Sequence, residues 1–415
     1  MRDIAAAART GDWLTRERIT VYAILLLIAY ALNEVWVFST AQGLLDSLGR
    51  PLGTDFANVW SSGKLVLLGR PEAALSPYDL RPFQQALFGM GAGLFYGWHY
   101  PPLFLGVAAL LATLPYTLAL VLWLASTGAL YLVAVRKIFA GLDVRPRDVV
   151  LTAAAYPAVF TCITHGQNGF LSAALMGGGL VLLPARPVLA GVLLGLLAYK
   201  PQYGLLIPVA LVVAGAWRTI ASACMTVAAT VALSIAAFGT RSWAAFFEHA
   251  SFTRETLLEN GGPGWSKLQG VFPAVRLLGG GIELAYALQL LTIGALAAMI
   301  VWLWRSPASD PQKAAGLILA TMLSTPYAFN YETVLLGPAI AYLVADGVRG
   351  GFAPYEKTLL AVLWVTPLLS RELTAATSIP VATLVNAIVL ACLLAKVHTA
   401  TVRTLPPASA KMRYA

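Results

Sequence analysis

The sequence predicts an all-α, polytopic integral membrane protein, and three properties of its 415 residues carry that prediction. First, 59% of the residues are hydrophobic and 11% are charged, whereas a soluble domain carries roughly a quarter charged residues. Second, the apolar residues between positions 19 and 397 form long stretches rather than alternating, which favours membrane helices over a β-barrel. Third, the few polar clusters that interrupt these stretches are expected to share one side of the bilayer.

About twelve apolar segments are predicted to cross the bilayer. They lie near residues 19–40, 117–137, 149–164, 168–183, 187–200, 203–217, 219–238, 284–304, 314–326, 333–347, 357–370 and 379–397. Several of them are shorter than the roughly 20 residues that a helix needs to span hydrocarbon unaided. We therefore expect the short segments to be packed inside the bundle or to lie beside a water-filled cavity. Residues 101–113 are interpreted as a short helix that turns near Pro115 and does not change sides.

The distribution of charge predicts the orientation of the chain. With a cytoplasmic N-terminus, the inside loops hold 18 of the 28 Lys and Arg residues and 8 acidic residues, while the outside loops hold 10 of each. Glu34 in the first predicted span completes the net charge of +9. The positive excess therefore lies on the cytoplasmic side, as the positive-inside rule expects, and nucleic-acid binding loses its support. This gives cytoplasmic tails at 1–18 and 398–415 around a transmembrane domain at 19–397.

Two outer loops are long enough to hold structure of their own. Residues 41–100 carry an apolar pattern that predicts two short amphipathic helices lying on the outer membrane face. Residues 239–283 combine several aromatic residues with a Gly-Gly-Pro-Gly turn at 261–264. We interpret this second loop as an interfacial segment followed by a flexible element that closes over a ligand.

Asp55 is the first candidate for chemistry. It stands directly before the first predicted interfacial helix, where an aspartate side chain commonly caps the helix by accepting backbone N–H bonds. A carboxylate at the mouth of an apolar cavity is also suited to take a proton from a sugar hydroxyl. Both interpretations of Asp55 stay open on the sequence alone.

Two further polar clusters interrupt apolar segments on the predicted outer side. His99 and Tyr100 precede two prolines that fix the start of a helix, so both side chains are candidates to line a site. The second cluster is a turn in which glycines flank Gln167 and Asn168, with His165 just before it. A tight turn explains the glycines. It does not explain the three polar side chains, which are therefore candidates for ligand contact.

Two ionisable residues near the outer membrane face complete the candidates. Lys200, followed by Gln202, ends an apolar segment, where a lone lysine commonly extends to the interface but also suits a phosphate. Glu332 is either a second acid or the ion-pair partner of Lys200 or another cation. Tyr327 and Asn330 stand in the same polar stretch and are candidates to line the cavity.

The chain has no Walker loop, dinucleotide fingerprint, His/Cys metal cluster or nucleophile elbow. Chemistry on a soluble nucleotide-sugar is therefore disfavoured. A membrane-embedded enzyme without a nucleotide site needs an activated substrate that is already dissolved in the bilayer.

Several short motifs, taken in order after Asp55, resemble glycosyltransferase family 87 over roughly residues 50–345. They are Gly-Arg-Pro at 69–71, Ser-Pro-Tyr-Asp at 76–79, Tyr-Pro-Pro at 100–102, Gly-Gln-Asn-Gly at 166–169, Ala-Gly-Val-Leu-Leu-Gly at 190–195, Lys-Pro-Gln at 200–202 and Thr-Pro-Tyr at 325–327. The resemblance implies a GT-C-like helical bundle in the bacterial inner membrane, with both termini cytoplasmic and the site periplasmic. It also implies inverting transfer of a hexose, as in mannosyltransferases, from a polyprenyl-phosphate sugar to a lipid or glycan acceptor.

The resemblance assigns expected roles to particular positions. Asp55 matches the carboxylate proposed as general base, while Lys200 and the turn at 166–169 match motifs near the donor. The stretch at 330–332 departs from the mannosyltransferase branch, which tends to carry a histidine there, so His165 or His99 are candidates to substitute. No cofactor is expected, and side chains rather than a metal ion are expected to hold the phosphate, because the outer loops hold no dense carboxylate cluster.

Two other classes of protein fit parts of the same pattern. A transporter or lipid flippase would share the polytopic build, but such proteins usually show repeated halves and broken helices at the bilayer midplane. A non-catalytic subunit of an envelope-assembly pathway would need Asp55 only as a helix cap.

Overall fold

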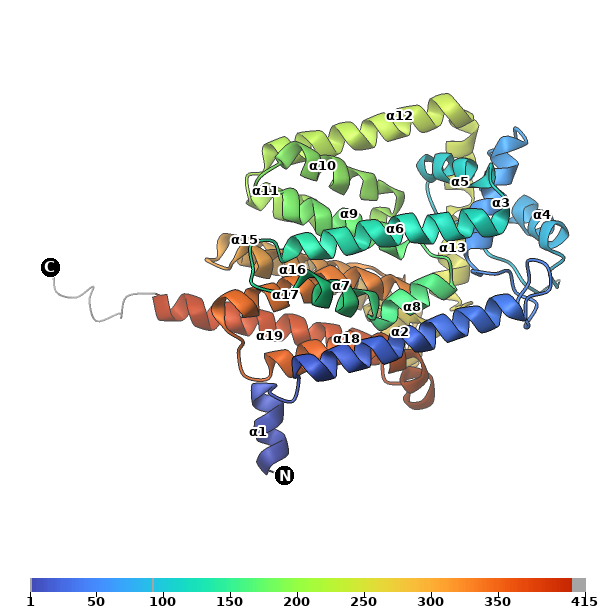
Figure 1. Ribbon diagram of the computed structural model, residues 1–415. Coiled ribbons are helices and arrows are strands. Elements are labelled where there is room, and N and C mark those ends of the chain that lie inside the picture. Colours follow the sequence, from blue (N-terminus) through green and yellow to red (C-terminus); the bar gives the residue numbers. More distant parts are fainter. Residues whose placement is uncertain (1, 92, 405–415) are drawn as a thin grey trace, which may run out of the picture.

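The computed structural model describes residues 2–91 and 93–404 and shows a bundle of helices running roughly along one axis (Figure 1). Six helices are long and apolar enough to cross a membrane. They are α2 (Arg16–Ser39), α6 (Tyr116–Ile138), α12 (Trp217–Glu248), α15 (Ile282–Arg305), α18 (Glu356–Thr377) and α19 (Val381–Thr404). Each coincides with one of the twelve expected crossings, so the chain is a multi-pass, all-α membrane protein; the remaining six crossings stay predictions.

Shorter elements fill the rest of the described chain. The α-helices are α1 (Arg2–Thr10), α3 (Phe56–Leu67), α4 (Pro77–Phe88), α5 (Leu105–Ala112), α7 (Pro146–Ala154), α8 (Pro157–Thr164), α9 (Gly169–Leu182), α10 (Pro187–Leu196), α11 (Ile207–Val213), α13 (Ala250–Thr253), α14 (Val271–Leu277), α16 (Asp310–Ser324) and α17 (Leu336–Gly350). The short helical turns are η1 (Pro102–Phe104), η2 (Leu197–Tyr199), η3 (Pro201–Gly204), η4 (Arg254–Glu259), η5 (Trp265–Lys267) and η6 (Asn330–Leu335). Two strands, β1 (Leu268–Gln269) and β2 (Ala328–Phe329), pair antiparallel.

The central helices are the short ones. Most residues of α16, α17 and α9 are buried. The long helices surround them: only 6% of the most apolar window of α12 is buried, so its surface is left for lipid. Short length is tolerated at the centre because protein, rather than lipid, surrounds these helices.

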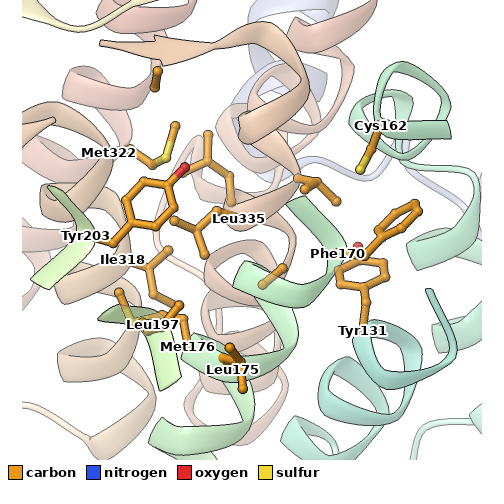
Figure 2. Packing of buried hydrophobic residues seen from close by; sticks show 14 of the residues in the cluster. Tyr131, Cys162, Phe170, Leu175, Met176, Leu197, Tyr203, Ile318, Met322 and Leu335 are labelled. Atoms are coloured by element: carbon orange, nitrogen blue, oxygen red, sulfur yellow. The ribbon is translucent and has the colours of Figure 1, made fainter. Parts of the chain in front are cut away.

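Aromatic and aliphatic side chains fill this centre closely. Figure 2 shows Tyr203 beside Met322 and Leu335. The ring of Phe170 stacks on that of Tyr131 with 5.8 Å between centroids. The beginning of α9, which follows the Gly-Gln-Asn-Gly turn, is thereby fixed in the core, and the turn is held at the end of a rigid helix.

The outer loops differ in part from the prediction. Helices α3 and α4 occur where two were expected, but α3 is not an amphipathic surface helix: nine of its twelve residues are buried, and it packs closely against α5. The prediction failed because polar residues of α3, such as Ser61 and Ser62, are covered by protein instead of facing water. Residues 101–113 do form a short helix, η1 followed by α5, beside α3 (Figure 1).

The second outer loop begins later than expected. Helix α12 continues to Glu248 after a break at Gly239, whose φ of 74° and ψ of 163° are not helical. Helix α1 lies within the expected tail 1–18, and α19 continues into the expected tail 398–415 as far as Thr404. The rest of the expected tail 398–415, from residue 405 on, lies outside the described residues.

Candidate active site

A polar cavity of about 490 Å³ lies among loops at the end of the bundle where α3, α4, α5 and α13 are found, away from α1 (Figure 1). Ten of the eleven side chains singled out in the sequence line it. They are Asp55, His99, Tyr100, His165, Gln167, Lys200, Gln202, Tyr327, Asn330 and Glu332. The eleventh, Asn168, is buried behind the cavity, where its backbone carbonyl accepts a hydrogen bond from the Tyr199 hydroxyl at 3.2 Å.

Two glycine turns bring Asp55 to the cavity. Gly53 and Gly166 both have positive φ, 67° and 58°, and a Cβ on Gly166 would lie 2.6 Å from that of Phe56 and 2.8 Å from the Gly53 carbonyl oxygen. Only glycine allows the two turns to approach so closely. Thr54, directly after Gly53, adopts a φ of 27°, a strained conformation for a residue with a side chain. The strain lies directly beside the candidate base.

The side chain of Asp55 does not cap α3. Its backbone stands at the N-cap position, but its carboxylate makes no cap hydrogen bond. Instead Asp55 Oδ2 accepts a hydrogen bond from Gln167 Nε2 at 2.8 Å. The capping interpretation is therefore wrong, because the turn directs the carboxylate toward Gln167 and not toward the backbone of the helix.

Gln167 is oriented by two donors on its other side. Its Oε1 accepts from the Asn168 backbone N–H at 3.2 Å and from the Tyr100 hydroxyl at 3.4 Å. Since that oxygen is occupied by donors, the amide nitrogen has to face Asp55. The chain thus holds one carboxylate at a fixed place in the cavity through a side-chain amide.

Lys200 does not extend to the interface. Its side chain is 3% exposed, and Nζ lies 2.6 Å from Glu332 Oε1, while the Glu332 side chain is 5% exposed. Glu332 Oε2 also accepts a hydrogen bond from the Phe329 backbone N–H at 2.9 Å. Of the alternatives open on the sequence, the ion pair is the one observed, and the interfacial interpretation of Lys200 is wrong because the bundle encloses it.

The two cavity histidines are held differently. His99 Nδ1 lies 2.9 Å from the Thr253 hydroxyl, and burial lowers the pKa of His99 to about 4. His99 is therefore neutral at physiological pH. His165 Nδ1 is 2.8 Å from the Thr161 carbonyl oxygen. A carbonyl only accepts hydrogen bonds, so Nδ1 of His165 carries a hydrogen and donates it to Thr161.

The β1–β2 pair joins the second outer loop to the stretch at 325–335. Next to it, Gln269 Nε2 donates to Asn330 Oδ1 at 2.8 Å, so the Asn330 amide is held across the two segments. The loop contributes Gly262 and Pro263 of the Gly-Gly-Pro-Gly turn to the cavity lining. The loop therefore reaches the cavity, whereas its closure over a ligand stays a prediction.

Sequence reasoning missed three cations that also line the cavity: Arg81, Lys267 and Arg371. Lys267 follows the glycine-rich turn by three residues and was part of a loop already singled out, so a search for cations in that loop would have found it. Arg371 follows an apolar segment directly and looks like an ordinary interfacial arginine. Only the folded chain brings it beside the cavity.

Among the described residues, 2–91 and 93–404, no group of three or more His, Cys, Asp and Glu side chains is arranged to hold a metal ion. The side chains that reach the cavity are carboxylates, amides, imidazoles, phenols and cations. Such a set can bind the hydroxyls of a sugar and an anionic group, and one carboxylate among them can accept a proton.

A multi-pass bundle that carries a loop-built polar cavity with a positioned carboxylate defines a membrane-embedded enzyme. The family model for glycosyltransferase family 87 matches residues 98–326, more than half of the chain. The chain belongs to glycosyltransferase family 87 and is a membrane glycosyltransferase. No curated protein and no solved structure matches it. Asp55 precedes the matched residues and Glu332 and Arg371 follow them, so their roles are argued from the geometry of this chain.

Replacing Gln167 tests whether it positions Asp55. Gln167→Ala is expected to lower kcat by roughly 10²-fold with a smaller change in KM, because the carboxylate loses the contact that fixes its place. Gln167→Glu places a second carboxylate beside Asp55, so the acid limb of the pH–rate profile should move to higher pH. Steady-state kinetics across pH measure both. An unmoved pH profile in Gln167→Glu would contradict the positioning role.

Proposed function

We propose that this glycosyltransferase transfers a hexose, in the manner of a mannosyltransferase, from a polyprenyl-phosphate donor to a lipid or glycan acceptor. The acceptor hydroxyl oxygen forms a bond to C1 of the sugar while its proton passes to Asp55. The bond between C1 and the phosphate oxygen breaks, and its electron pair stays on the phosphate. One base and a single displacement give inversion at C1.

The position of Asp55 supports this proposal most directly. Its carboxylate is free of any capping role, is held by Gln167 at 2.8 Å, and lines a cavity rich in sugar-binding side-chain types. A carboxylate used only for structure would be expected to bond the helix backbone. We assign Gln202 and His165 to donor contacts, and His99, Tyr100, Tyr327 and Asn330 to the cavity wall around the acceptor.

The donor class is tested by reconstitution. Purified protein in liposomes is expected to transfer radiolabelled sugar from a polyprenyl-phosphate hexose to extracted bacterial lipids, and not from a nucleotide-sugar. The reason is that no nucleotide-binding motif accompanies the cavity, which lies among loops at the ends of membrane helices. Transfer from the nucleotide-sugar alone would contradict the proposed donor, and movement of lipid across the bilayer without transfer would favour a flippase.

We propose further that the cavity lies on the periplasmic side of a bacterial inner membrane and that both termini are cytoplasmic. Two observations support it: the outer loops hold 10 of the 28 basic residues, and the cavity lies at the opposite end of the bundle from α1 (Figure 1). Positive charge is retained on the cytoplasmic side during insertion.

Cysteine labelling in intact cells tests the orientation. The native Cys162, Cys224 and Cys392, all free thiols, are first replaced by serine or alanine. A cysteine introduced at exposed Tyr78 is expected to react with a membrane-impermeant maleimide, whereas one at exposed Arg145 should react only after the membrane is opened. Labelling of both positions from outside would overturn the orientation.

A further inference from the structure

The cavity carries more positive than negative charge. Four cations line it, Arg81, Lys200, Lys267 and Arg371, against two carboxylates, Asp55 and Glu332. A surplus of positive charge in a recess walled by protein attracts anionic groups and stabilises negative charge that develops there.

Two of these four cations are already engaged. Lys200 is neutralised by Glu332 within a buried pair at 2.6 Å. Arg81 lies over the ring of Phe95, with its guanidinium carbon 4.8 Å from the centroid. A phosphate that took Lys200 would have to leave Glu332 buried without its partner, which is costly. A phosphate is therefore expected to bind mainly at the other two cations.

Lys267 and Arg371 are the available cations. Within residues 2–91 and 93–404, Lys267 makes no ion pair. Arg371 makes one there, with Glu372 at 3.8 Å, and the Glu372 side chain is 80% exposed. Their elements, η5 and α18, pack against each other. Burial and then the neighbouring Arg371 lower the pKa of Lys267, while Asp55 raises it, as expected for groups that share one cavity.

An apolar groove meets the cavity at Arg371. This second space, about 760 Å³, is lined mainly by apolar side chains of α2, α6 and α8, with small residues such as Ala125 and Gly128 on α6. His165 and Arg371 line both spaces.

Few charged side chains line the groove. Asp46 and Arg50 form an ion pair at 2.7 Å, and the other two charged residues, Glu34 and Arg371, are of opposite sign. The groove therefore suits a hydrocarbon chain, and the cavity next to it suits the anionic head.

We propose that Lys267 and Arg371 hold the phosphate of the lipid-linked donor and that the groove between α2 and α6 takes its isoprenoid tail. The proposal rests on the proposed function and names the residues that serve it. As the bond to C1 breaks, the phosphate gains negative charge, and these two cations face that charge from the η5 loop and from α18. Arg371, at the junction of the two spaces, sets where the head ends and the tail begins.

Binding of undecaprenyl phosphate, which carries no sugar, tests the cations without requiring catalysis. Purified protein in nanodiscs is titrated with the lipid, and the complex is quantified by native mass spectrometry. Lys267→Ala and Arg371→Ala are each expected to weaken binding by roughly 10- to 100-fold, as for loss of a charge-assisted contact. The matched control is Arg70→Ala, because the Arg70 side chain is 55% exposed and does not line the cavity. This variant should bind the lipid with the affinity of the wild type.

Variants whose side chains fill the groove test whether it binds the isoprenoid tail. The Cβ of a residue at 128 would reach Phe170 at 3.8 Å, so Gly128→Leu projects its side chain into the groove, and Ala125→Leu does the same as a second variant should the first fail to fold. Either variant should bind the 55-carbon lipid at least tenfold more weakly than the wild type does. Both should bind a 10-carbon prenyl phosphate with the affinity of the wild type. Leu130→Phe, on the exposed face of α6, is the control.

The outcomes separate the two proposals. If wild type binds undecaprenyl phosphate and the Lys267, Arg371 and groove variants bind it equally well, this inference is overturned and the proposed function stands. If Arg70→Ala weakens binding as much as Arg371→Ala, the effect is general electrostatics and the inference is likewise overturned. If wild type binds no polyprenyl phosphate, the proposed donor fails and the inference fails with it.

Discussion

Asp55→Asn is expected to reduce sugar transfer by ~10² to 10⁴ while the protein folds normally and binds its lipid donor as before. Asparagine is nearly isosteric and its Oδ1 can still accept the hydrogen bond that Gln167 Nε2 makes to Asp55 at 2.8 Å. It cannot take a proton from an acceptor hydroxyl at neutral pH. Turnover with saturating donor and acceptor, measured beside donor binding and the melting temperature, separates these effects.

The matched control is Asp79→Asn, since Asp79 is a 49% exposed carboxylate of α4 that does not line the cavity. Its turnover should equal that of the wild type. Asp55→Ala should lose activity as fully as Asp55→Asn without a capping penalty, because the carboxylate makes no cap bond. Near-normal turnover in Asp55→Asn would remove Asp55 from the mechanism.

Lys200→Ala is expected to destabilise the protein by about 3–5 kcal/mol, since it leaves the buried Glu332 without the cation 2.6 Å away. The effect should appear as a large fall in melting temperature in detergent, with or without donor present. Lys137→Ala, which removes an exposed lysine at the end of α6, should leave the melting temperature unchanged.

A double variant distinguishes the ion pair from a phosphate contact. Lys200→Met with Glu332→Gln replaces both charges by neutral groups of similar size, and its melting temperature should return close to that of the wild type. A single variant that melts like the wild type but loses donor binding would instead assign Lys200 to the phosphate.

Hydropathy predicted the six long helices well because each of them faces lipid over much of its surface. It predicted α3 poorly, since Ser61 and Ser62 look solvent-facing in sequence but are covered by protein. Periodicity shows which side of a helix is polar. It does not show whether water or another helix meets that side.

The candidate site was predicted largely from where polar residues interrupt apolar segments, and that rule found Asp55 and Gln167. It left open whether Glu332 is a second acid or pairs with Lys200 or another cation, because the two residues are 132 positions apart in the sequence and meet only in the folded bundle. Nor could it find Arg371, which is one of many arginines at a segment end. The chemistry of a residue is visible in sequence, whereas the identity of its neighbour depends on the fold.

The short central helices also constrain how the protein is made. Helix α9 has 14 residues, too few to enter a bilayer as an independent span during synthesis. It has to insert together with neighbours such as α6 and α10, against which it packs. In a reporter fusion truncated after α9, this helix lacks α10, so the side of the membrane on which the reporter is found need not be the native one. The orientation therefore has to be measured on the full-length chain.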